Sequence, residues 1–467
     1  MTSKPKTQKR TVAKVGGVGL SIQDLLLLGM RLHREDRFDE AEKCYRAVLQ
    51  AEPRTANAMH FLGVLLHHIG RQPVQALQLI RASIKLDPTV APWHNNLGNV
   101  LLGQEFYDDA AAAYARCSEL DPDNLEVLNN LGVLLRRLQR PQEAEQALKR
   151  AVALEPSFAH AHANLATLYS FQEREDEAFL HFAKAAALKP NDHLASQMLV
   201  RAYGKAGRFE DGRNFLREWL EREPDNPQAR HFLAAYGGAD VPERASDQYI
   251  EDEFDAFAKS FDAKLASLDY RAPQFVGEAV ARLLGPGQRR WRIVDVGCGT
   301  GLCGPYLRPY ALDLAGVDLS ANMLELAHAR GLYDSLVKSE LVAWLEHCAQ
   351  PQDLVVSADT MTYFGRLGPV FAAARRALVA DGHLIFTVES HAGQAEFTLQ
   401  AHGRYSHARG SIRAELERAG FGAIDIREVA LRSESGLPVA GSLVCARAHG
   451  MVDEILQDAV KEPGHAT

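Results

Sequence analysis

Six prolines recur at a nearly fixed interval in the first half of the sequence and limit what this half can fold into. They close phrases such as LDP and LEP, spaced 35 residues once and then 34 residues four times, at Pro53, Pro88, Pro122, Pro156, Pro190 and Pro224. Proline ends a helix because it lacks the amide hydrogen and clashes with the preceding turn. This period therefore predicts a stack of repeated helix pairs instead of one globular core.

Matching positions within each period indicate two helices per repeat. A Leu-Gly pair recurs in the first helix, and a small residue in the second helix is followed four positions later by a large one. Because residues four apart share a helical face, both should face the neighbouring helix, which the glycine allows to approach closely. The pattern resembles the tetratricopeptide repeat family. That resemblance implies an all-α superhelix of about six repeats and a capping helix over residues 21–240.

Three asparagines lie on one line along the expected concave face of this superhelix. Asn96, Asn130 and Asn164 are 34 residues apart in the phrases NNLG, NNLG and ANLA. They resemble the asparagine ladder of O-linked GlcNAc transferase, which implies a protein or peptide partner on the concave face. An amide side chain offers both a donor and an acceptor to an extended chain. In the alternative interpretation, these asparagines tie helix to helix within the array.

The repeat pattern ends in the phrase YGGADVPER, and we place a domain boundary near residue 240. Beyond it, apolar runs such as RIVDVG, LAGVDLS and DLVVSAD alternate with helical stretches, which predicts a mostly parallel α/β sheet. The first of these runs leads into the glycine-rich turn VDVGCGTG, which contains Gly297, Gly299 and Gly301. Ligands of open α/β sheets bind at the carboxyl ends of the strands, where such a turn lets the backbone approach them.

This turn lacks the features of a phosphate site. A dinucleotide fingerprint needs its third glycine at residue 302, which is leucine, and the GK[ST] sequence of a P-loop is absent. Asp295, just before the turn, suits an ammonium group, and Asp318, at the end of the next strand, can accept both hydroxyls of a ribose. A ligand with a ribose, a positive amino-acid tail and no phosphate is S-adenosylmethionine.

Residues 245–448 resemble class I S-adenosylmethionine-dependent methyltransferases in the acid before GxGxG and in the stretches GVDLSANMLELA and DLVVSADTMTYFG. The resemblance implies a Rossmann-like domain with a mostly parallel seven-stranded sheet over residues 241–450. It also implies that the glycines surround the methionine end of the cofactor and that Asp359 stands where donor and acceptor meet. The residues implied at the ribose, at the two faces of the adenine and at its amino group are Asp318, Leu319, Met323 and Glu340.

The stretch YIEDEFDAFAKSFDAKLASLDYRAP opens this domain with a line of apolar residues on one helical face. A core stripe is the usual meaning of such a line. The stretch also resembles the entry segment of predicted methyltransferases fused to tetratricopeptide repeats. This resemblance implies a helix that closes over the cofactor, with Tyr270 at the methionine carboxylate.

Methyl transfer needs a nucleophile aligned with the donor and the exclusion of water, and an amine or phenol acceptor also needs a group that takes its proton. We expect catalytic side chains in the loops after the fourth and fifth strands, namely His391, Tyr363 and Asp359. We expect Tyr405 and His407 to contact the substrate. The loop sequence SADT differs from the [DNS]PP[YF] of amide and adenine methylases, and no Pro-Cys pair offers the nucleophile of pyrimidine methylases.

Composition excludes several classes of partner. The 52 basic and 60 acidic residues give a formal charge of -8, which argues against nucleic acid. Six scattered cysteines form no zinc pattern, so we expect no metal site and a reduced cytoplasmic protein. The sequence has no apolar run of about 18 residues that would span a membrane. We expect a disordered basic tail at residues 1–20 and another tail at residues 451–467.

Three hypotheses for the function follow from this organisation. In the first, the chain is a methyltransferase whose repeats recruit a protein, a peptide or a substrate carried on a protein. In the second, the repeats form an interaction scaffold and the methyltransferase fold is not catalytic. In the third, the enzyme methylates a carboxyl or hydroxyl group of a small molecule, and the repeats serve assembly.

Overall fold

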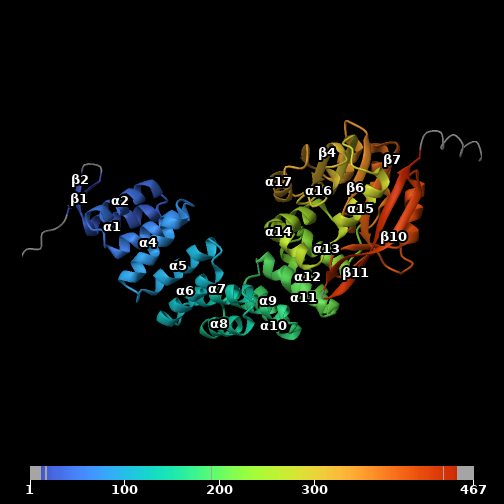
Figure 1. Cartoon of the computed structure of the whole chain (residues 1–467). Coiled ribbons are helices and arrows are strands. Elements are labelled where there is room, and N and C mark those ends of the chain that lie inside the picture. The colour runs from blue at the N-terminus through green and yellow to red at the C-terminus, as the bar shows by residue number, and fades with distance from the viewer. Residues whose placement is uncertain (1–11, 16–17, 191, 435, 450–467) are drawn as a thin grey trace, which may run out of the picture. The chain divides into compact units, whose positions relative to one another are not determined.

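The computed structural model describes residues 12–15, 18–190, 192–434 and 436–449, and the chain divides into two compact units, residues 1–202 and 203–467 (Figure 1). The expected tail at residues 451–467 lies outside the described residues. Where the sequence predicted a tail before residue 21, two short antiparallel strands form, β1 (Val12–Val15) and β2 (Val18–Ser21). The valines of this stretch favour extended structure.

The first unit is a row of antiparallel helix pairs that follow one another along the chain (Figure 1). Each second helix ends two residues before one of the recurring prolines, as the sequence predicted. The last helix of the row, α11 (His193–Lys205), contains the division between the two units. The helices before it are α1 (Ile22–Arg34), α2 (Phe38–Ala51), α3 (Ala56–His68), α4 (Pro73–Leu86), α5 (Ala91–Gly103), α6 (Tyr107–Leu120), α7 (Leu125–Arg137), α8 (Pro141–Leu154), α9 (Ala159–Phe171) and α10 (Glu175–Leu188).

The glycines of the Leu-Gly pairs lie where the two helices of a repeat approach each other most closely. A Cβ atom on Gly98 would lie 2.5 Å from the Tyr114 ring, and one on Gly132 would lie 2.5 Å from Leu148 Cγ. Both large residues are fully buried. This geometry explains why a glycine recurs opposite a large residue, and it confirms the helix pairing.

The second unit starts with helices that continue the repeat pattern: α12 (Phe209–Arg222) and α13 (Pro227–Ala235). The long helix α14 (Asp247–Ser267) follows, and then α15 (Ala272–Leu284). Helix α13 contacts α14 through His231, whose ring stacks on Tyr249 with centroids 4.1 Å apart. The capping helix expected from the sequence is therefore packed into the same unit as the α/β sheet.

Seven strands form one mixed sheet in the order β10-β11-β7-β6-β3-β4-β5, in which β11 alone runs antiparallel to its neighbours. The mostly parallel seven-stranded sheet predicted from the sequence is confirmed. The strands are β3 (Trp291–Val296), β4 (Ala311–Asp318), β5 (Ser335–Lys338), β6 (Gln352–Ser357), β7 (Leu378–Glu389), β10 (Phe421–Glu434) and β11 (Leu437–Ala448). A separate hairpin pairs β8 (Phe397–Leu399) with β9 (Tyr405–His407).

Helices cover both faces of this sheet, which is the usual way to bury parallel strands. On one face, α18 (Leu341–His347), α19 (Gly368–Ala377) and α20 (Arg409–Arg418) bury the larger apolar cluster. On the other face, α15 and the short α16 (Gly304–Leu307) bury a second cluster. Helix α17 (Ala321–Ala329) contacts α14 and β5. No helix among the described residues is both long and apolar enough to cross a bilayer.

Candidate functional site

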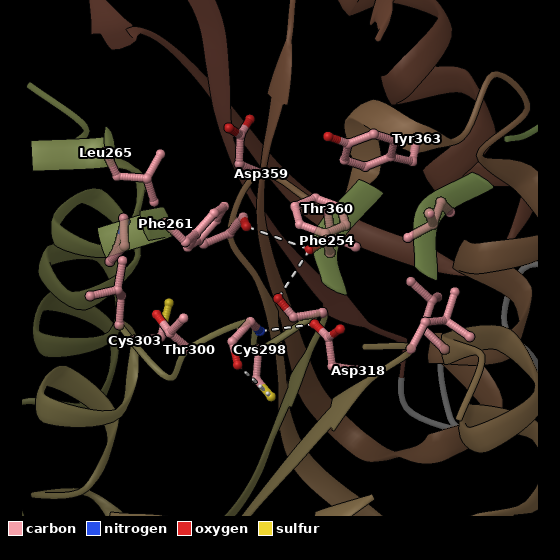
Figure 2. Close-up of a pocket in the computed structure, with 18 of the residues that line it drawn as sticks. Phe254, Phe261, Leu265, Cys298, Thr300, Cys303, Asp318, Asp359, Thr360 and Tyr363 are labelled. Atoms are coloured by element: carbon pink, nitrogen blue, oxygen red, sulfur yellow. Dashed lines mark hydrogen bonds between the residues drawn. The ribbon is translucent and has the colours of Figure 1, made fainter. Parts of the chain in front are cut away.

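A pocket lies at the carboxyl ends of β3, β4 and β6, where the fold predicts a ligand. The space in it that atoms do not fill is about 1160 Å³, including the part that is open to solvent. One wall is the apolar face of α14, and Figure 2 shows Phe254, Phe261 and Leu265 directed toward the turns after the strands. The pocket therefore combines an apolar wall with polar groups on strand ends, as small-molecule sites usually do.

The glycine-rich turn after β3 depends on backbone conformations that other residues rarely adopt. The φ angles are 73° at Gly297, 54° at Gly299 and 84° at Gly301, all in the left-handed region. A side chain on Gly297 would collide with Thr360, whose hydroxyl donates a hydrogen bond of 3.2 Å to the Gly297 carbonyl. Gly297 and Gly299 line the pocket, whereas Gly301, also expected at the cofactor, does not and instead packs closely against the Tyr333 ring. The turn thus brings backbone close to any ligand.

Asp318 links the glycine turn to the end of β4. Its Oδ2 accepts a hydrogen bond of 2.9 Å from the Gly299 N–H, and its Oδ1 accepts one of 2.9 Å from the Ser320 N–H. Each carboxylate oxygen has a second lone pair, so Asp318 can still accept two hydroxyl groups. Burial raises the pKa of this carboxyl, and the backbone donors of Ser320, Gly299 and Leu319 oppose the shift. Asp318 lines the pocket, as the ribose prediction requires.

Asp295 is buried at the end of β3 and does not line the pocket itself. The Tyr333 hydroxyl donates a hydrogen bond of 2.7 Å to its Oδ2, while Oδ1 is buried and has no partner within the described residues. Burial raises the pKa of Asp295 to about 7; the Tyr333 hydrogen bond opposes this shift, and the charge of Asp318 adds to it. A positive group bound at the turn would favour the ionised carboxylate.

The helix α14 is fixed over the pocket by acidic residues that bind the turns around it. Asp262 accepts a hydrogen bond of 2.6 Å from the Thr300 hydroxyl and pairs with Arg330. Asp255 accepts hydrogen bonds from the Ser320 hydroxyl and from the Asn322 N–H. These contacts hold the apolar face of α14 against the turns after β3 and β4, where the sequence predicted a covering helix.

Among the other residues expected at the cofactor, Leu319, Glu340 and Tyr270 line the pocket. Glu340 also caps α18, because its Oε2 accepts a hydrogen bond of 2.8 Å from the Ala343 N–H. Met323 does not line the pocket. It is fully buried in α17, whose first turn is capped by Ser320, so its side chain is part of the core.

Of the three residues expected to be catalytic, Asp359 and Tyr363 line the pocket and His391 does not. Figure 2 shows Asp359 and Tyr363 at the end of the pocket opposite Asp318. The His391 N–H donates to the His407 carbonyl at 3.2 Å, and its Nδ1 accepts a hydrogen bond from the Gly393 N–H. His391 therefore stabilises the loop after β7, away from the pocket.

Tyr405 and His407, expected at the substrate, are both buried in the β8–β9 hairpin and do not line the pocket. The Tyr405 hydroxyl donates a hydrogen bond of 2.9 Å to the Pro242 carbonyl. His407 Nε2 lies 3.0 Å from the Gly365 carbonyl, and burial lowers the pKa of this histidine to about 4. Both side chains therefore hold the hairpin in place.

A partly buried cluster of charges at the Asp359 end of the pocket was missed from the sequence. Arg432 of β10 is 3% exposed and donates to Asp359 Oδ2 at 2.7 Å, to Glu434 at 2.7 Å and to Glu389. Arg404 donates to Glu389 at 2.7 Å and to Glu434 at 2.6 Å. Arg404, Arg432 and Glu434 line the pocket. No spacing pattern links these residues, because Arg432 is 73 positions from Asp359 in the chain.

The three asparagines of the repeats are half-buried in the first unit. The Asn96 amide nitrogen on α5 donates to His60 Nε2 on α3 at 3.0 Å, and that of Asn164 on α9 donates to Asn129 Oδ1 on α7 at 2.7 Å. Asn130 makes no side-chain hydrogen bond with any described residue. Two of the three therefore tie neighbouring repeats together, as in the alternative interpretation, while the amide of Asn130 remains available.

Family models match both units of the chain. A tetratricopeptide repeat model matches residues 26–91, 95–157 and 135–193, and a second one matches residues 172–236. A methyltransferase domain model matches residues 294–386. The chain joins tetratricopeptide repeats to a methyltransferase domain. The pocket described above lies in this methyltransferase domain.

Curated relatives are similar to parts of the chain only. Methyltransferase-like protein 27 of Homo sapiens is 38% identical over 24% of this chain and 43% of its own length. The biotin biosynthesis bifunctional protein BioHC of Saccharophagus degradans is 32% identical over 28% of this chain and 24% of its own length. A malonyl-[acyl-carrier protein] O-methyltransferase of Acetivibrio thermocellus is 30% identical over 27% and 44%. The chain thus spans less than half the length of each of these three relatives.

Proposed function

We propose that the chain is an S-adenosylmethionine-dependent methyltransferase whose repeat array recruits a protein, a peptide or a substrate carried on a protein. The observation that carries the proposal is the joint placement of the glycine turn and Asp318 in one pocket, linked by the hydrogen bond from Gly299. A scaffold without catalysis has no need of this arrangement, because the arrangement leaves acceptor lone pairs of the half-buried Asp318 carboxylate directed at an open pocket.

The residues of the pocket fit this cofactor. A Cβ atom on Gly299 would meet only the Phe261 ring, at 3.9 Å, so the turn leaves a cradle that a side chain would fill. Asp318 would take the ribose hydroxyls, and Glu340 and Leu319 would lie at the adenine. The unpartnered oxygen of Asp295 places negative charge behind the turn, which favours the ammonium of the amino-acid tail. Within the described part of the chain, no lysine or arginine lines the pocket at the turn, where a phosphate would need one.

When bound, the cofactor supplies an electrophilic methyl group on its sulfonium. The chain's own residues bind the cofactor, orient the acceptor and exclude water. The apolar face of α14 keeps water from the pocket through Phe254 and Phe261, which meet edge to face with ring centroids 5.9 Å apart. Phe254 also meets the Tyr363 ring edge to face at 5.4 Å, which orients that phenol beside Asp359. Dry, fixed surroundings of this kind align a nucleophile for transfer.

Recruitment by the repeats is supported by the array itself and by one relative. Tetratricopeptide arrays present an extended surface of helices, which suits a chain-like partner. The relative from Acetivibrio thermocellus is named for a substrate attached to a carrier protein. A substrate of this kind needs a surface for its protein part as well as a pocket for its reacting group.

The cofactor site can be tested by calorimetric titration of S-adenosylhomocysteine into the full chain. We expect micromolar affinity in the wild type and a loss of at least tenfold in Asp318→Ala, because two hydroxyl hydrogen bonds to a charged group are removed. The matched control is Asp313→Ala, an exposed carboxylate of the same strand, which should bind as the wild type does. Folded wild type that does not bind the ligand would rule out the proposal.

Recruitment can be tested by transfer of a labelled methyl group from S-adenosylmethionine to the proteins of a cell lysate. Asn130→Ala on α7 should reduce the transfer while leaving the affinity for S-adenosylhomocysteine unchanged. Glu126→Ala, an exposed residue of the same helix, is the control. Equal transfer by wild type and Asn130→Ala would show that the substrate does not pass along this line of asparagines.

A further inference from the structure

We propose that the group methylated in this pocket is an amine, bound and deprotonated by Asp359. This inference rests on the proposed function and names the substrate class of the same site. It depends on the position of Asp359, on an oxygen of Asp359 that has no hydrogen-bond partner among the described residues, and on the charge balance around this carboxylate.

Asp359 lies at the end of the pocket that the cofactor's ribose would not occupy. In Figure 2, Asp318 and Asp359 stand at opposite ends, with Thr360 between them. Asp359 follows β6 and holds a left-handed backbone with φ of 61°, which costs about 1–3 kcal/mol for a residue other than glycine. Its N–H donates to the Thr387 hydroxyl at 2.8 Å, and its carbonyl accepts from the Thr362 hydroxyl at 2.9 Å. The surrounding structure thus fixes this carboxylate in a strained position.

Among the residues that the structure describes, only one oxygen of the Asp359 carboxylate has a hydrogen-bond partner. Oδ2 accepts the hydrogen bond from Arg432 at 2.7 Å, whereas Oδ1 is buried and meets no donor in the part of the chain that the structure describes. A buried acceptor without a donor costs about 1–3 kcal/mol. Because Asp359 lines the pocket, a ligand that carries an N–H or O–H can supply the missing donor. An ionised carboxyl acceptor has no hydrogen to donate.

The charges at this end of the pocket favour a cation over an anion. Three carboxylates, of Asp359, Glu389 and Glu434, face two guanidinium groups, of Arg404 and Arg432, and each guanidinium already pairs with two or more of the carboxylates. The formal sum is therefore one negative charge. His402 lies 3.6 Å from Glu389, and desolvation lowers the pKa of this histidine, which favours its neutral form at neutral pH. A protonated amine would bring the cluster to neutrality, and a carboxylate would double its net charge.

The chemistry balances with groups that are present in the site and in the donor. An ammonium gives one proton to Asp359 Oδ1 and becomes a neutral amine. The nitrogen lone pair then forms the bond to the methyl carbon, while the carbon–sulfur bond breaks and its electron pair stays on sulfur. The product is a methylated ammonium, and the proton leaves Asp359 to solvent when the product departs. Burial raises the pKa of Asp359, although Arg432 opposes this shift, so the carboxylate is a better proton acceptor than an exposed one.

Binding of two small probes tests the proposal without knowledge of the natural substrate. Butylamine and butyrate have similar sizes and opposite charges, and their binding to the full chain loaded with S-adenosylhomocysteine can be followed by ligand-observed NMR. We expect the wild type to bind butylamine and to prefer it over butyrate at least tenfold. Asp359→Asn should lose this preference, whereas Asp381→Asn, an exposed carboxylate of β7, should keep it. Preference for butyrate, or binding of neither probe, overturns the proposal.

The affinity of Asp359→Asn for S-adenosylhomocysteine separates this proposal from a simpler role. We expect the variant to bind this ligand within about threefold of the wild type. A loss as large as that of Asp318→Ala would mean that Asp359 holds the amino group of the cofactor, and the amine proposal would fail while the proposed function stands. Folded wild type that binds no S-adenosylhomocysteine would instead defeat the proposed function.

The chemical stability of the transferred label gives an independent result. After incubation with tritiated S-adenosylmethionine and cell lysate, methyl esters release volatile methanol in base, whereas methylated amines retain their label. We expect the label to survive base, and Asp359→Asn to reduce transfer about a hundredfold or more, the usual size of a proton-transfer contribution. Label that is released by base would overturn the proposal.

Discussion

Replacing Asp295 with asparagine should make the second unit more stable at alkaline pH and remove the part of its pH dependence that comes from this carboxyl. Asp295 is 1% exposed, and burial raises the pKa of its carboxyl from 3.8 to about 7. Between these two values the folded protein keeps a proton that the unfolded chain releases. The free energy of unfolding of the wild type therefore decreases as pH rises through this window, and the decrease is complete above about pH 7.

The size of the effect follows from the width of the window. Each pKa unit corresponds to about 1.4 kcal/mol, so a shift from 3.8 to about 7 amounts to about 4 kcal/mol. The amide that replaces the carboxyl has no proton to lose in this range, and its carbonyl oxygen can still accept the hydrogen bond from Tyr333. We therefore expect Asp295→Asn to be more stable than the wild type by up to about 4 kcal/mol near pH 8, with little difference near pH 4.

Urea unfolding read by pulsed hydrogen exchange can measure this effect in the second unit alone. Peptides that cover β3 and β4 report the unfolding of the sheet, while the repeats report separately. The expected result is a midpoint whose change between pH 4 and pH 8 differs between the two proteins, with the wild type losing up to about 4 kcal/mol more than Asp295→Asn as pH rises. Parallel midpoints in the two proteins from pH 4 to pH 8 would refute a raised pKa at Asp295. The ionised Asp295 carboxylate should also favour the ammonium group of the ligand. The affinity of the wild type for S-adenosylhomocysteine should therefore fall below pH 7, where this carboxyl takes up a proton.

Three further substitutions test other contacts. Tyr333→Phe removes the hydrogen bond that opposes the raised pKa of Asp295, so the same titration should move to higher pH; an unmoved midpoint would contradict this. Gly132→Ala gains about 1 kcal/mol of helix propensity but places a methyl group 2.5 Å from Leu148. We expect a net loss of about 1–2 kcal/mol in thermal unfolding of the first unit, and a stabilised variant would be inconsistent with the close approach. His231→Phe leaves a buried carbonyl of the β8–β9 turn without its donor, at a cost of about 1–3 kcal/mol. Faster hydrogen exchange in residues 397–407 should reveal this loss of stability, and unchanged exchange would contradict the contact between His231 and Gly403.

The repeats were predictable because their signals are local and recur. The interval between prolines gives the end of every second helix, and Gly98 and Gly132 give the points of closest approach. The asparagines were harder to interpret. The same spacing that puts Asn96 and Asn164 on one line also puts each beside a polar group of the neighbouring repeat, and the sequence does not tell which contact forms.

The cofactor end of the pocket was predictable for a similar reason. Gly299 and Asp318 are 19 residues apart and follow adjacent parallel strands, so strand order alone brings them together. The acceptor end of the pocket was not predictable in this way. Arg432 reaches Asp359 only because β10 and β7 pair with β11 in the mixed part of the sheet, and His391 fails to reach the pocket because its backbone pairs with His407. The positions of Arg432 and His391 depend on how β11 and β10 pair at one edge of the sheet, which the sequence does not show.

The β8–β9 hairpin connects the acceptor end of the pocket to the last helix of the repeat pattern. His231 Nε2 of α13 lies 2.7 Å from the carbonyl oxygen of Gly403, a residue with a left-handed φ of 87°, and the next residue, Arg404, lines the pocket.

The sequence places the domain boundary near residue 240, whereas the compact unit begins at Tyr203. A fragment that starts at residue 241 would lack α13 and would leave the Gly403 carbonyl without its donor and the Tyr249 ring without its stacking partner. Because Arg404 and Arg432 together neutralise Glu389 and Glu434, a displaced hairpin would also change the charge that faces the acceptor. The repeat-derived helix is therefore a structural part of the acceptor site, and a catalytic fragment must include it.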